Sequence, residues 1–326
     1  MMLKLKEDNG LFLKFKNKII SFDSIHQNST YAFVSHAHSD HVIKKKTDIP
    51  ILSSKETVKL INSRTNKLPN NYIESLENAK LLNAGHVLGS KSLLLEVDEK
   101  KILYTGDFNT RDRLFLKGFK PVKADILIME TTFGKPNYVF PKFKEVSKEA
   151  SDWVQDQLKK GKNVMIIGYA LGKAQILCKL FEKLPYPIFV DSQIIKINSV
   201  YSDFGIELRG FPSIREAKEK GYLSTPSIMV VPPHMVKYYW TPETKTAFFT
   251  GWANTGYPNK KIMNYDKTFS MSDHADYKEL IEVVKKTDPE IVYTMHGFNR
   301  EFAKDLKDLG FNAKPLVNGQ TKIEDF

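Results

Sequence analysis

Histidine is the residue type through which this sequence is best equipped to do chemistry. Three of its eight histidines fall in one short segment, His36-Ala37-His38-Ser39-Asp40-His41, directly after an apolar stretch. Alternate residues of an extended segment point the same way, so His36 and His38 can reach one cation. Asp40 and His41, in the following turn, can reach a second. Imidazole and carboxylate together suit zinc, or manganese if the site is richer in oxygen.

Three further segments place a His or Asp next to a glycine after an apolar strand. They are Asn83-Ala84-Gly85-His86, Tyr104-Thr105-Gly106-Asp107 and Thr294-Met295-His296-Gly297. In such segments glycine lets the backbone turn so that the polar side chain faces the site. A lone histidine after a strand is more often structural than a metal ligand. Taken together, however, the four segments favour a metal site.

Composition excludes several other classes of protein. The 326 residues carry 49 Lys and Arg against 38 Asp and Glu, a net charge of +11 that suits a polyanionic partner. With 41% hydrophobic and 27% charged residues, the chain is typical of a globular protein of about two domains. No apolar run is long enough for a membrane span or a signal peptide, so we expect a cytoplasmic protein without a membrane partner. The single cysteine, Cys178, excludes a thiolate cage for zinc.

The predicted elements change character along the chain. Up to about residue 130 they are mainly strands, with a meander over 3–23 and polar clusters at the strand ends. After Gly134, a long amphipathic helix over 143–160 opens a stretch in which strands and helices alternate. Strand and helix patterns resume over 277–309. We therefore predict one domain formed by 1–135 and 257–326, interrupted by a second α/β domain at 136–256.

The order of these motifs resembles the metallo-β-lactamase superfamily. The resembling residues are Asp23, the His36 to His41 segment, His86 and Asp107, as its first to fourth motifs. Three further segments resemble the extra motifs of its β-CASP branch, which are nucleases: Glu130-Thr131-Thr132-Phe133-Gly134, Ser272-Asp273-His274-Ala275-Asp276 and His296-Gly297. The resemblance implies an α/β fold, a four-layer αβ/βα sandwich with an inserted α/β β-CASP cap domain.

The resemblance also implies a ligand set for two divalent metal ions, with Zn²⁺ favoured over Mn²⁺. One ion would be held by His36, His38 and His86, and the other by Asp40, His41 and His296. Asp107 would bridge them, and Asp23 would orient a ligand histidine from behind.

Two more residues are predicted to take part in the chemistry. When a phosphodiester is hydrolysed, the leaving group departs as an alkoxide, and a proton supplied to it makes this departure easier. We therefore predict that His274 is a general acid or a phosphate ligand. Glu130 would hold the tautomer of His274 and raise its pKa. Asp40 would additionally orient the attacking water.

Substrate contacts are predicted at three basic or glycine-rich segments. Gly168 to Gln175 turns from strand into helix, and its helix N-terminus could receive a phosphate beside Lys173 and Gln175. Basic residues also follow two of the metal motifs, and these are Lys44, Lys45, Arg111 and Arg113. Tyr238-Tyr239-Trp240 could stack on bases or pack within the cap.

The sequence thus predicts a two-metal nuclease. Tyr169 to Gln175 and the Ser272 to Asp276 segment resemble the short ligase-associated DNA exonucleases and the archaeal proteins similar to mRNA 3′-end processing factors. This favours an exonuclease on DNA ends in repair, with a DNA ligase or helicase as candidate partner. The alternatives are a β-CASP ribonuclease of RNA processing or decay, a small-molecule metallohydrolase, and a nucleic-acid-binding scaffold with an inactive site.

Overall fold

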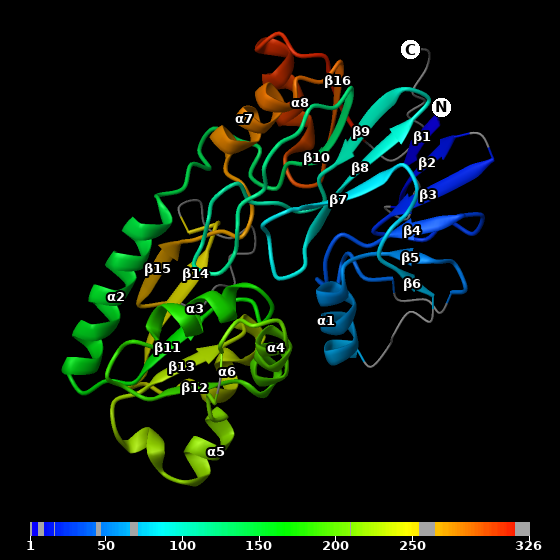
Figure 1. Ribbon diagram of the computed structural model, residues 1–326. Helices are drawn as coiled ribbons and strands as arrows, with labels where there is room; N and C mark the ends of the chain where they lie inside the picture. Colours follow the sequence, from blue (N-terminus) through cyan, green and yellow to red (C-terminus); the bar gives the residue numbers. More distant parts are fainter. Residues whose placement is uncertain are drawn as a thin grey trace. The chain divides into compact units, whose positions relative to one another are not determined.

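The computed structural model describes residues 2–5, 10–15, 17–43, 47–65, 71–208, 210–253 and 265–316. The chain forms two compact units (Figure 1). The first, here called the flanking unit, comprises Met1–Asp112, Leu116–Val139 and His274–Phe326. The second, the inserted unit, comprises Arg113–Phe115 and Phe140–Asp273. Among the described helices, none is long and apolar enough to cross a membrane.

The flanking unit contains two six-stranded sheets. The first is formed in order by β1 (Met2–Leu5), β2 (Leu11–Phe15), β3 (Lys18–Phe22), β4 (Tyr31–Phe33), β5 (Ile51–Leu52) and β6 (Tyr72–Ile73). The order in the second is β17 (Ala313–Pro315), β16 (Ile291–Met295), β10 (Ile126–Glu130), β9 (Lys100–Tyr104), β8 (Lys91–Val97) and β7 (Ala79–Asn83). β1, β2 and β3 pair antiparallel, as do β7, β8 and β9, and the other neighbouring strands of the two sheets pair in parallel.

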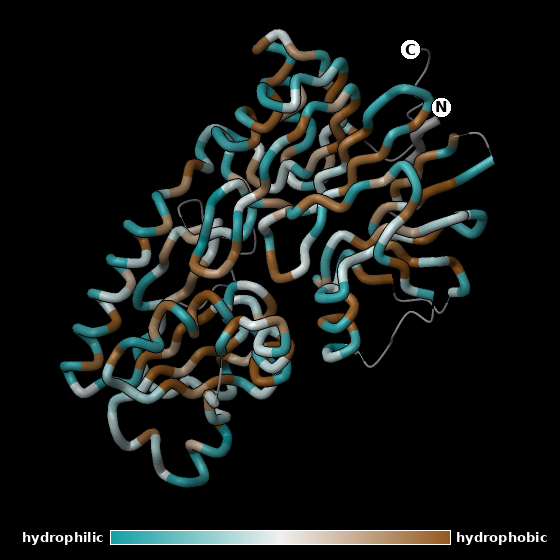
Figure 2. Tube along the Cα trace, viewed as in Figure 1, coloured by the Kyte–Doolittle hydropathy of each residue, from teal (hydrophilic) through white to brown (hydrophobic). Residues whose placement is uncertain are grey.

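Strand β10 shows how the layers of the flanking unit are held together. Its alternate residues point to opposite faces of the sheet. Ile126 and Ile128 join the core between the two sheets, which also contains Phe33 of β4. Leu127 and Met129 pack instead among residues of helices α7 (Tyr277–Thr287) and α8 (Asn299–Asp308). Helix α1 (Lys55–Thr65) follows β5 in the chain. Figure 2 shows apolar residues, in brown, both along the strands and in the helices.

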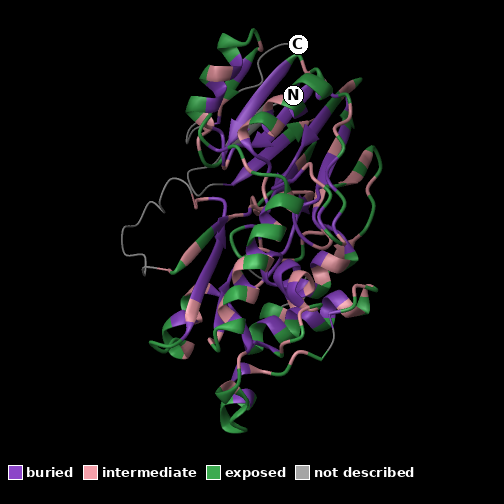
Figure 3. Ribbon diagram, turned by 90° about the vertical axis from the view of Figure 1, so that its left-hand side faces the viewer, coloured by how far each residue is buried: buried purple, intermediate pink, exposed green. Residues whose placement is uncertain are grey.

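The inserted unit is built on a five-stranded parallel sheet. Its strands, in order, are β12 (Ile188–Val190), β13 (Ile228–Val231), β11 (Val164–Ile167), β14 (Lys245–Thr250) and β15 (Lys267–Ser270). Strands β11 and β13 are buried along their whole length, as expected for parallel strands covered on both faces. Figure 3 shows the buried residues in purple. The helices are α2 (Phe143–Lys159), α3 (Lys173–Phe181), α4 (Ser192–Asp203), α5 (Ile214–Glu219) and α6 (Val236–Tyr239), with short 3-10 turns at Tyr222–Ser224 and Pro233–Met235.

Helix α2 illustrates why these residues become helical. Val146, Ala150, Val154 and Leu158 recur every fourth residue and are all buried. They form one apolar stripe, which is the pattern of an amphipathic helix packed on a sheet. The other faces carry Lys, Glu and Asp.

The limits of the inserted unit differ from those expected at 136 and 256. The unit runs from Phe140 to Asp273, because β15 pairs in parallel with β14 and completes the inserted sheet. It also takes in Arg113–Phe115, where the Phe115 ring lies against Tyr201 at a centroid distance of 5.8 Å. Both features depend on contacts between residues far apart in the chain, which local sequence patterns do not reveal.

Candidate active site

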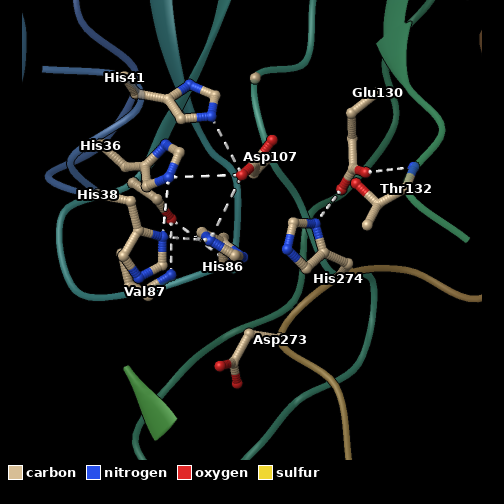
Figure 4. Close-up of polar contacts among 12 residues, drawn as sticks. His36, His38, His41, His86, Val87, Asp107, Glu130, Thr132, Asp273 and His274 are labelled. Carbon is tan, nitrogen blue, oxygen red and sulfur yellow. Dashed lines mark hydrogen bonds and ion pairs between the residues drawn. The ribbon is translucent and has the colours of Figure 1, made fainter. Parts of the chain in front are cut away.

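Four ligand atoms from three loops of the flanking unit converge on one point (Figure 4). They belong to His36, His38, His86 and Asp107, and all lie within 4.8 Å of one another. His38 Nδ1 is 3.0 Å from both His36 Nε2 and His86 Nε2. Asp107 Oδ2 is 3.5 Å from His36 Nε2 and 3.7 Å from His86 Nε2.

These separations fit a metal ion. Ligand atoms about 2.0–2.1 Å from a tetrahedral zinc lie about 3.3 Å from one another. The observed distances, 3.0 to 3.7 Å, bracket that value. The donor set is three imidazoles and one carboxylate, which is a zinc-type set. Because three of the four side chains are buried, a cation here would also be well shielded from water.

Strand ends and glycines bring these ligands together. His36 and His38 follow β4, His86 follows β7 and Asp107 follows β9. Just before Asp107, Gly106 has φ +55°, and a Cβ there would lie 2.7 Å from Cβ of Ser35. Gly85 has φ +70° and a Cβ would lie 2.5 Å from a backbone oxygen. Only glycine can make these approaches without displacing its neighbours.

His41 extends the cluster on one side. Its Nε2 is 3.4 Å from Asp107 Oδ2 and 3.7 Å from Asp40 Oδ2, while its Nδ1 is 2.9 Å from Asp23 Oδ2. Burial lowers the pKa of His41, but the carboxylates of Asp107 and Asp23 outweigh this and raise it well above its ordinary value. Burial raises the pKa of Asp107, and the opposing effect of His41 and His274 brings it well below its usual range. In the absence of a cation, an ionised Asp107 thus balances the histidines.

Asp23 holds the region behind His41. Besides His41, its carboxylate accepts hydrogen bonds from the Ser35 N–H at 2.6 Å, the Ser35 hydroxyl at 2.7 Å and the Tyr104 hydroxyl at 2.8 Å. Its φ is +47°, a rare conformation for a non-glycine residue that often marks functional sites. The sequence did not predict a role for Ser35, which precedes His36, or for Tyr104, which lies in the same segment as Asp107.

We expect Asp23→Asn to weaken zinc binding by about 10- to 100-fold, because partners behind a ligand histidine fix its tautomer and orientation. Competition with a chromophoric chelator measures this affinity. The matched control is Asp152→Asn, which removes an exposed carboxylate paired with Lys148. If Asp23→Asn binds zinc as tightly as the control, Asp23 does not support the site.

A carboxylate and a histidine form a second group next to the ligands. Glu130, the last residue of β10, is buried, and its Oε1 is 2.8 Å from His274 Nδ1. The same carboxylate accepts N–H bonds from Phe108 at 3.2 Å and Thr132 at 3.0 Å, so its orientation is fixed. The His274 ring lies 4.6 Å from that of His86. His274, whose Nδ1 is hydrogen-bonded to the Glu130 carboxylate, therefore lies beside the candidate metal ligands.

Two predicted ligands lie at the rim of the cluster. The Asp40 side chain is 78% exposed and approaches only His41 among the contacts given above. The His296 ring is exposed, and its centroid is 5.8 Å from that of His41. His296 has φ +60°, and the following Gly297 leaves no room for a Cβ, which would lie 2.4 Å from Cα of Thr132. The backbone there is tightly constrained.

The predicted substrate contacts of the inserted unit are buried instead of exposed. Lys173 donates to Asp273 Oδ1 at 3.0 Å and to the Met271 carbonyl at 2.8 Å. Burial, together with Arg113, lowers the pKa of Lys173 against the opposing effect of Asp273. Gln175 donates to Asn198 and to the Ala170 carbonyl. Both side chains are taken up by internal partners, and the predicted phosphate contacts of Lys173 and Gln175 stay a prediction.

Gly168 also has a different use from the one expected. A Cβ there would lie 2.5 Å from Cγ of Lys173, so the glycine makes room for the lysine stem. Within the same unit, Arg113 Nη1 is 2.7 Å from Asp273 Oδ1. Lys44 and Lys45 lie outside the described residues. Tyr238 and Trp240 are exposed, whereas the Tyr239 hydroxyl donates to Asp191 at 2.9 Å.

Comparison with known proteins indicates the family of the chain. Residues 265–314 match the family described as "Zn-dependent metallo-hydrolase RNA specificity domain". The chain is 36% identical over 301 residues to a probable DNA ligase of Opitutus terrae, covering 86% of this chain and 28% of that protein. It is 26% identical over 339 residues to an RNase J-like protein of Methanocaldococcus jannaschii, covering 81% and 80%. The chain thus spans little more than a quarter of the ligase-named relative.

A solved structure shares the fold. It is a protein of unknown function from Enterococcus faecalis, with a TM-score of 0.65 and 13% identity, and the match covers 99% of both chains. At this identity the likeness concerns the fold alone.

The paired sheets, the strand-end histidines and the Glu130–His274 pair define a mixed α/β protein with a candidate site for a divalent metal ion. The chain belongs to the metallo-β-lactamase superfamily, in its β-CASP branch. The predicted family and fold class, a metallo-β-lactamase fold with a cap domain, are thereby confirmed.

Proposed function

We propose that this nuclease is a two-zinc exonuclease that removes nucleotides from DNA ends. The observation that carries the phosphodiester chemistry is the 2.8 Å contact between Glu130 and His274 beside the metal ligands. A small-molecule metallohydrolase could use the metal ligands alone, but it has no need for a histidine directed by a carboxylate. DNA is favoured by the ligase-named relative, whose similarity covers 86% of this chain.

The metal ions would be held by the four converging residues of the flanking unit together with residues beside them. His36, His38 and His86 would bind one ion, and Asp40, His41 and His296 the other, with Asp107 shared. Manganese is the alternative to zinc. Bound there, two divalent cations would polarise the phosphodiester and lower the pKa of the attacking water. Asp40, exposed at the rim, would orient that water.

His274 would serve the leaving group. Its Nδ1 is bound to Glu130, so Nε2 is the nitrogen that can donate a proton to the departing alkoxide. Glu130 is held by two backbone N–H groups as well, which keeps the histidine in one tautomer and one orientation. The alternative role for His274 is to bind a phosphate oxygen.

A ribonuclease is the second candidate. It is favoured by the printed description of the matched family, an RNA specificity domain, and by the relative named as RNase J-like. In the DNA proposal, a DNA ligase would be the functional partner, because the ligase-named relative is longer and the similarity spans 28% of it. A helicase partner and a cytoplasmic location stay predictions.

The proposal is tested with matched single-stranded DNA and RNA, labelled at the 5′ or the 3′ end, in the presence of Zn²⁺ or Mn²⁺. We expect stepwise shortening of DNA from one end, and no shortening by an Asp40→Ala, His41→Ala double variant. Preferential cleavage of RNA would assign the protein to RNA processing or decay. If neither polymer is cleaved by a metal-loaded protein, the nuclease proposal fails.

A further inference from the structure

Phe108 and Asn109, which follow Asp107 in the chain, are hydrogen-bonded to the peptide group after His274. The Phe108 carbonyl accepts the Ala275 N–H at 2.8 Å, and Asn109 Nδ2 donates to the His274 carbonyl at 2.9 Å. These two groups belong to the same peptide bond, the one that joins His274 to Ala275. Both of its polar groups are therefore bound by neighbours of a metal ligand, and the peptide plane cannot rotate without breaking them.

The side chain of His274 is tied to the same segment through Glu130. The Phe108 N–H donates to Glu130 Oε1 at 3.2 Å, and this oxygen is 2.8 Å from His274 Nδ1. Phe108 thus holds the carboxylate with its N–H and the histidine backbone with its carbonyl. Because Phe108 follows Asp107 directly, the position of His274 is linked to that of the metal ligand.

Arg111 fixes the residues that come after His274. Its Nε donates to Glu279 Oε1 at 2.8 Å, and a second guanidinium nitrogen is hydrogen-bonded to Asp276 Oδ2. Asp276 and Glu279 are the capping box of α7: the Asp276 carboxylate accepts the Glu279 N–H at 3.0 Å, and the Glu279 carboxylate accepts the Asp276 N–H at 2.9 Å. Arg111 therefore holds the start of the helix that follows His274.

The Asn109 side chain connects Arg111 to His274 through two hydrogen bonds. The Arg111 N–H donates to Asn109 Oδ1 at 2.8 Å, while Asn109 Nδ2 holds the His274 carbonyl. Asn109 is buried, and the Arg111 side chain is 26% exposed. On the other side of His274, in the inserted unit, Asp273 is bound by Arg113 and Lys173.

We propose that Asn109 and Arg111 are positioning residues for His274. This inference rests on the proposed function, in which His274 acts on the leaving group. A displacement of about 1 Å can lower a rate about 100-fold, so a loosened His274 would still be present but poorly placed. The proposal differs from the expectation that Arg111 binds substrate phosphate, since that role would require the guanidinium to leave its two carboxylates.

The test compares Arg111→Met with Arg215→Met, which removes an exposed arginine paired with Glu219 in the inserted unit. For the zinc-loaded protein we expect Arg111→Met to lower kcat on DNA by about 10- to 100-fold, with KM and zinc content unchanged. In a His274→Ala background, Arg111→Met should cause no further loss, because it acts through His274. The control should resemble the wild type in both backgrounds.

Two results would overturn the proposal. An unchanged kcat with a raised KM would assign Arg111 to substrate binding, and an equal loss of kcat in the His274→Ala background would place its effect elsewhere. If Arg111→Met does not fold by circular dichroism, Asn109→Asp replaces it. That variant keeps the acceptor for the Arg111 N–H and removes the donor to His274.

A measurement that does not depend on DNA cleavage tests the positioning role separately from the proposed function. In a proton NMR spectrum, the imidazole Cε1–H resonance of His274 is assigned by its loss in His274→Ala. The chemical shift of this resonance should change in Arg111→Met or Asn109→Asp, while that of His234, in the inserted unit, should not change. A wild type that cleaves no nucleic acid refutes the proposed function. An unchanged His274 signal refutes the positioning role, whether or not DNA is cleaved.

Discussion

His274→Ala is expected to lower the turnover of DNA or RNA by about 10²- to 10⁴-fold, the usual contribution of a positioned general acid. A nitrophenyl phosphodiester should lose far less. Nitrophenolate is a weak base that departs without a proton, whereas the alkoxide of a nucleotide is a strong base. The difference between the two substrates therefore isolates proton donation from every other role of the side chain.

The controls for this experiment come from the chain itself. His234→Ala removes a histidine of the inserted unit that contacts Gln193, and it should leave both rates unchanged. Glu130→Gln keeps the size of the side chain that binds Nδ1 of His274 but removes its charge. It should therefore also lower the turnover of DNA, as His274→Ala does. Zinc content has to be measured in each variant, since the His274 ring lies 4.6 Å from that of His86.

Two outcomes would contradict the general-acid role. Equal losses on the nucleic acid and on the nitrophenyl ester would make His274 a phosphate ligand. Full turnover of nucleic acid by His274→Ala would remove it from the chemistry altogether.

Removal of the metal is the second change with a large expected effect. We expect a chelated protein to lose cleavage of phosphodiesters by about 10³-fold or more, because bound cations stabilise transition-state charge by several kcal/mol and each 1.4 kcal/mol is a factor of ten. The three imidazole nitrogens and one carboxylate oxygen crowd within 4.8 Å and would lose their common partner. A ligand that binds only the folded state also stabilises it, so chelation should lower the unfolding temperature.

The residues of the candidate metal cluster could be proposed from the sequence because their signals are local, and their role as metal ligands stays a prediction. His36 and His38 stand two apart at the end of a strand, and Gly85 and Gly106 each precede a ligand that must turn into the site. These patterns depend on backbone geometry over a few residues. The structure then brings together the ends of β4 in one sheet and of β7 and β9 in the other, a juxtaposition that depends on how the two sheets pack.

The roles of the basic residues could not be predicted in this way. Lys173 follows a glycine at the start of a helix, a local pattern that suits phosphate binding. Its partner in the structure, Asp273, lies 100 residues further along the chain. Likewise, Arg111 and Asp276 are separated by 165 residues. Local spacing carries no information on such pairs, and a buried cation looks the same in the sequence as an exposed one.

The limits of the inserted unit likewise depend on contacts between residues far apart in the chain. The strand Lys267–Ser270 is short, and only its parallel pairing with Lys245–Thr250 assigns it to the inserted sheet. The Arg113–Phe115 stretch belongs to the same unit through its contacts with Asp273 and Tyr201. Periodicity predicts that an element forms, whereas the sheet it joins is decided by packing.

The most direct test of the central claim is a zinc titration of the chelated protein, with bound metal and DNA cleavage measured in the same samples. We predict that cleavage is absent without metal, returns in proportion to bound zinc, and stops rising at two equivalents per chain. Asp107→Asn, which removes the shared carboxylate, should bind less zinc and regain little activity. Cleavage that persists in the chelated protein, or zinc that binds fully without restoring cleavage, would contradict a catalytic metal site at these residues.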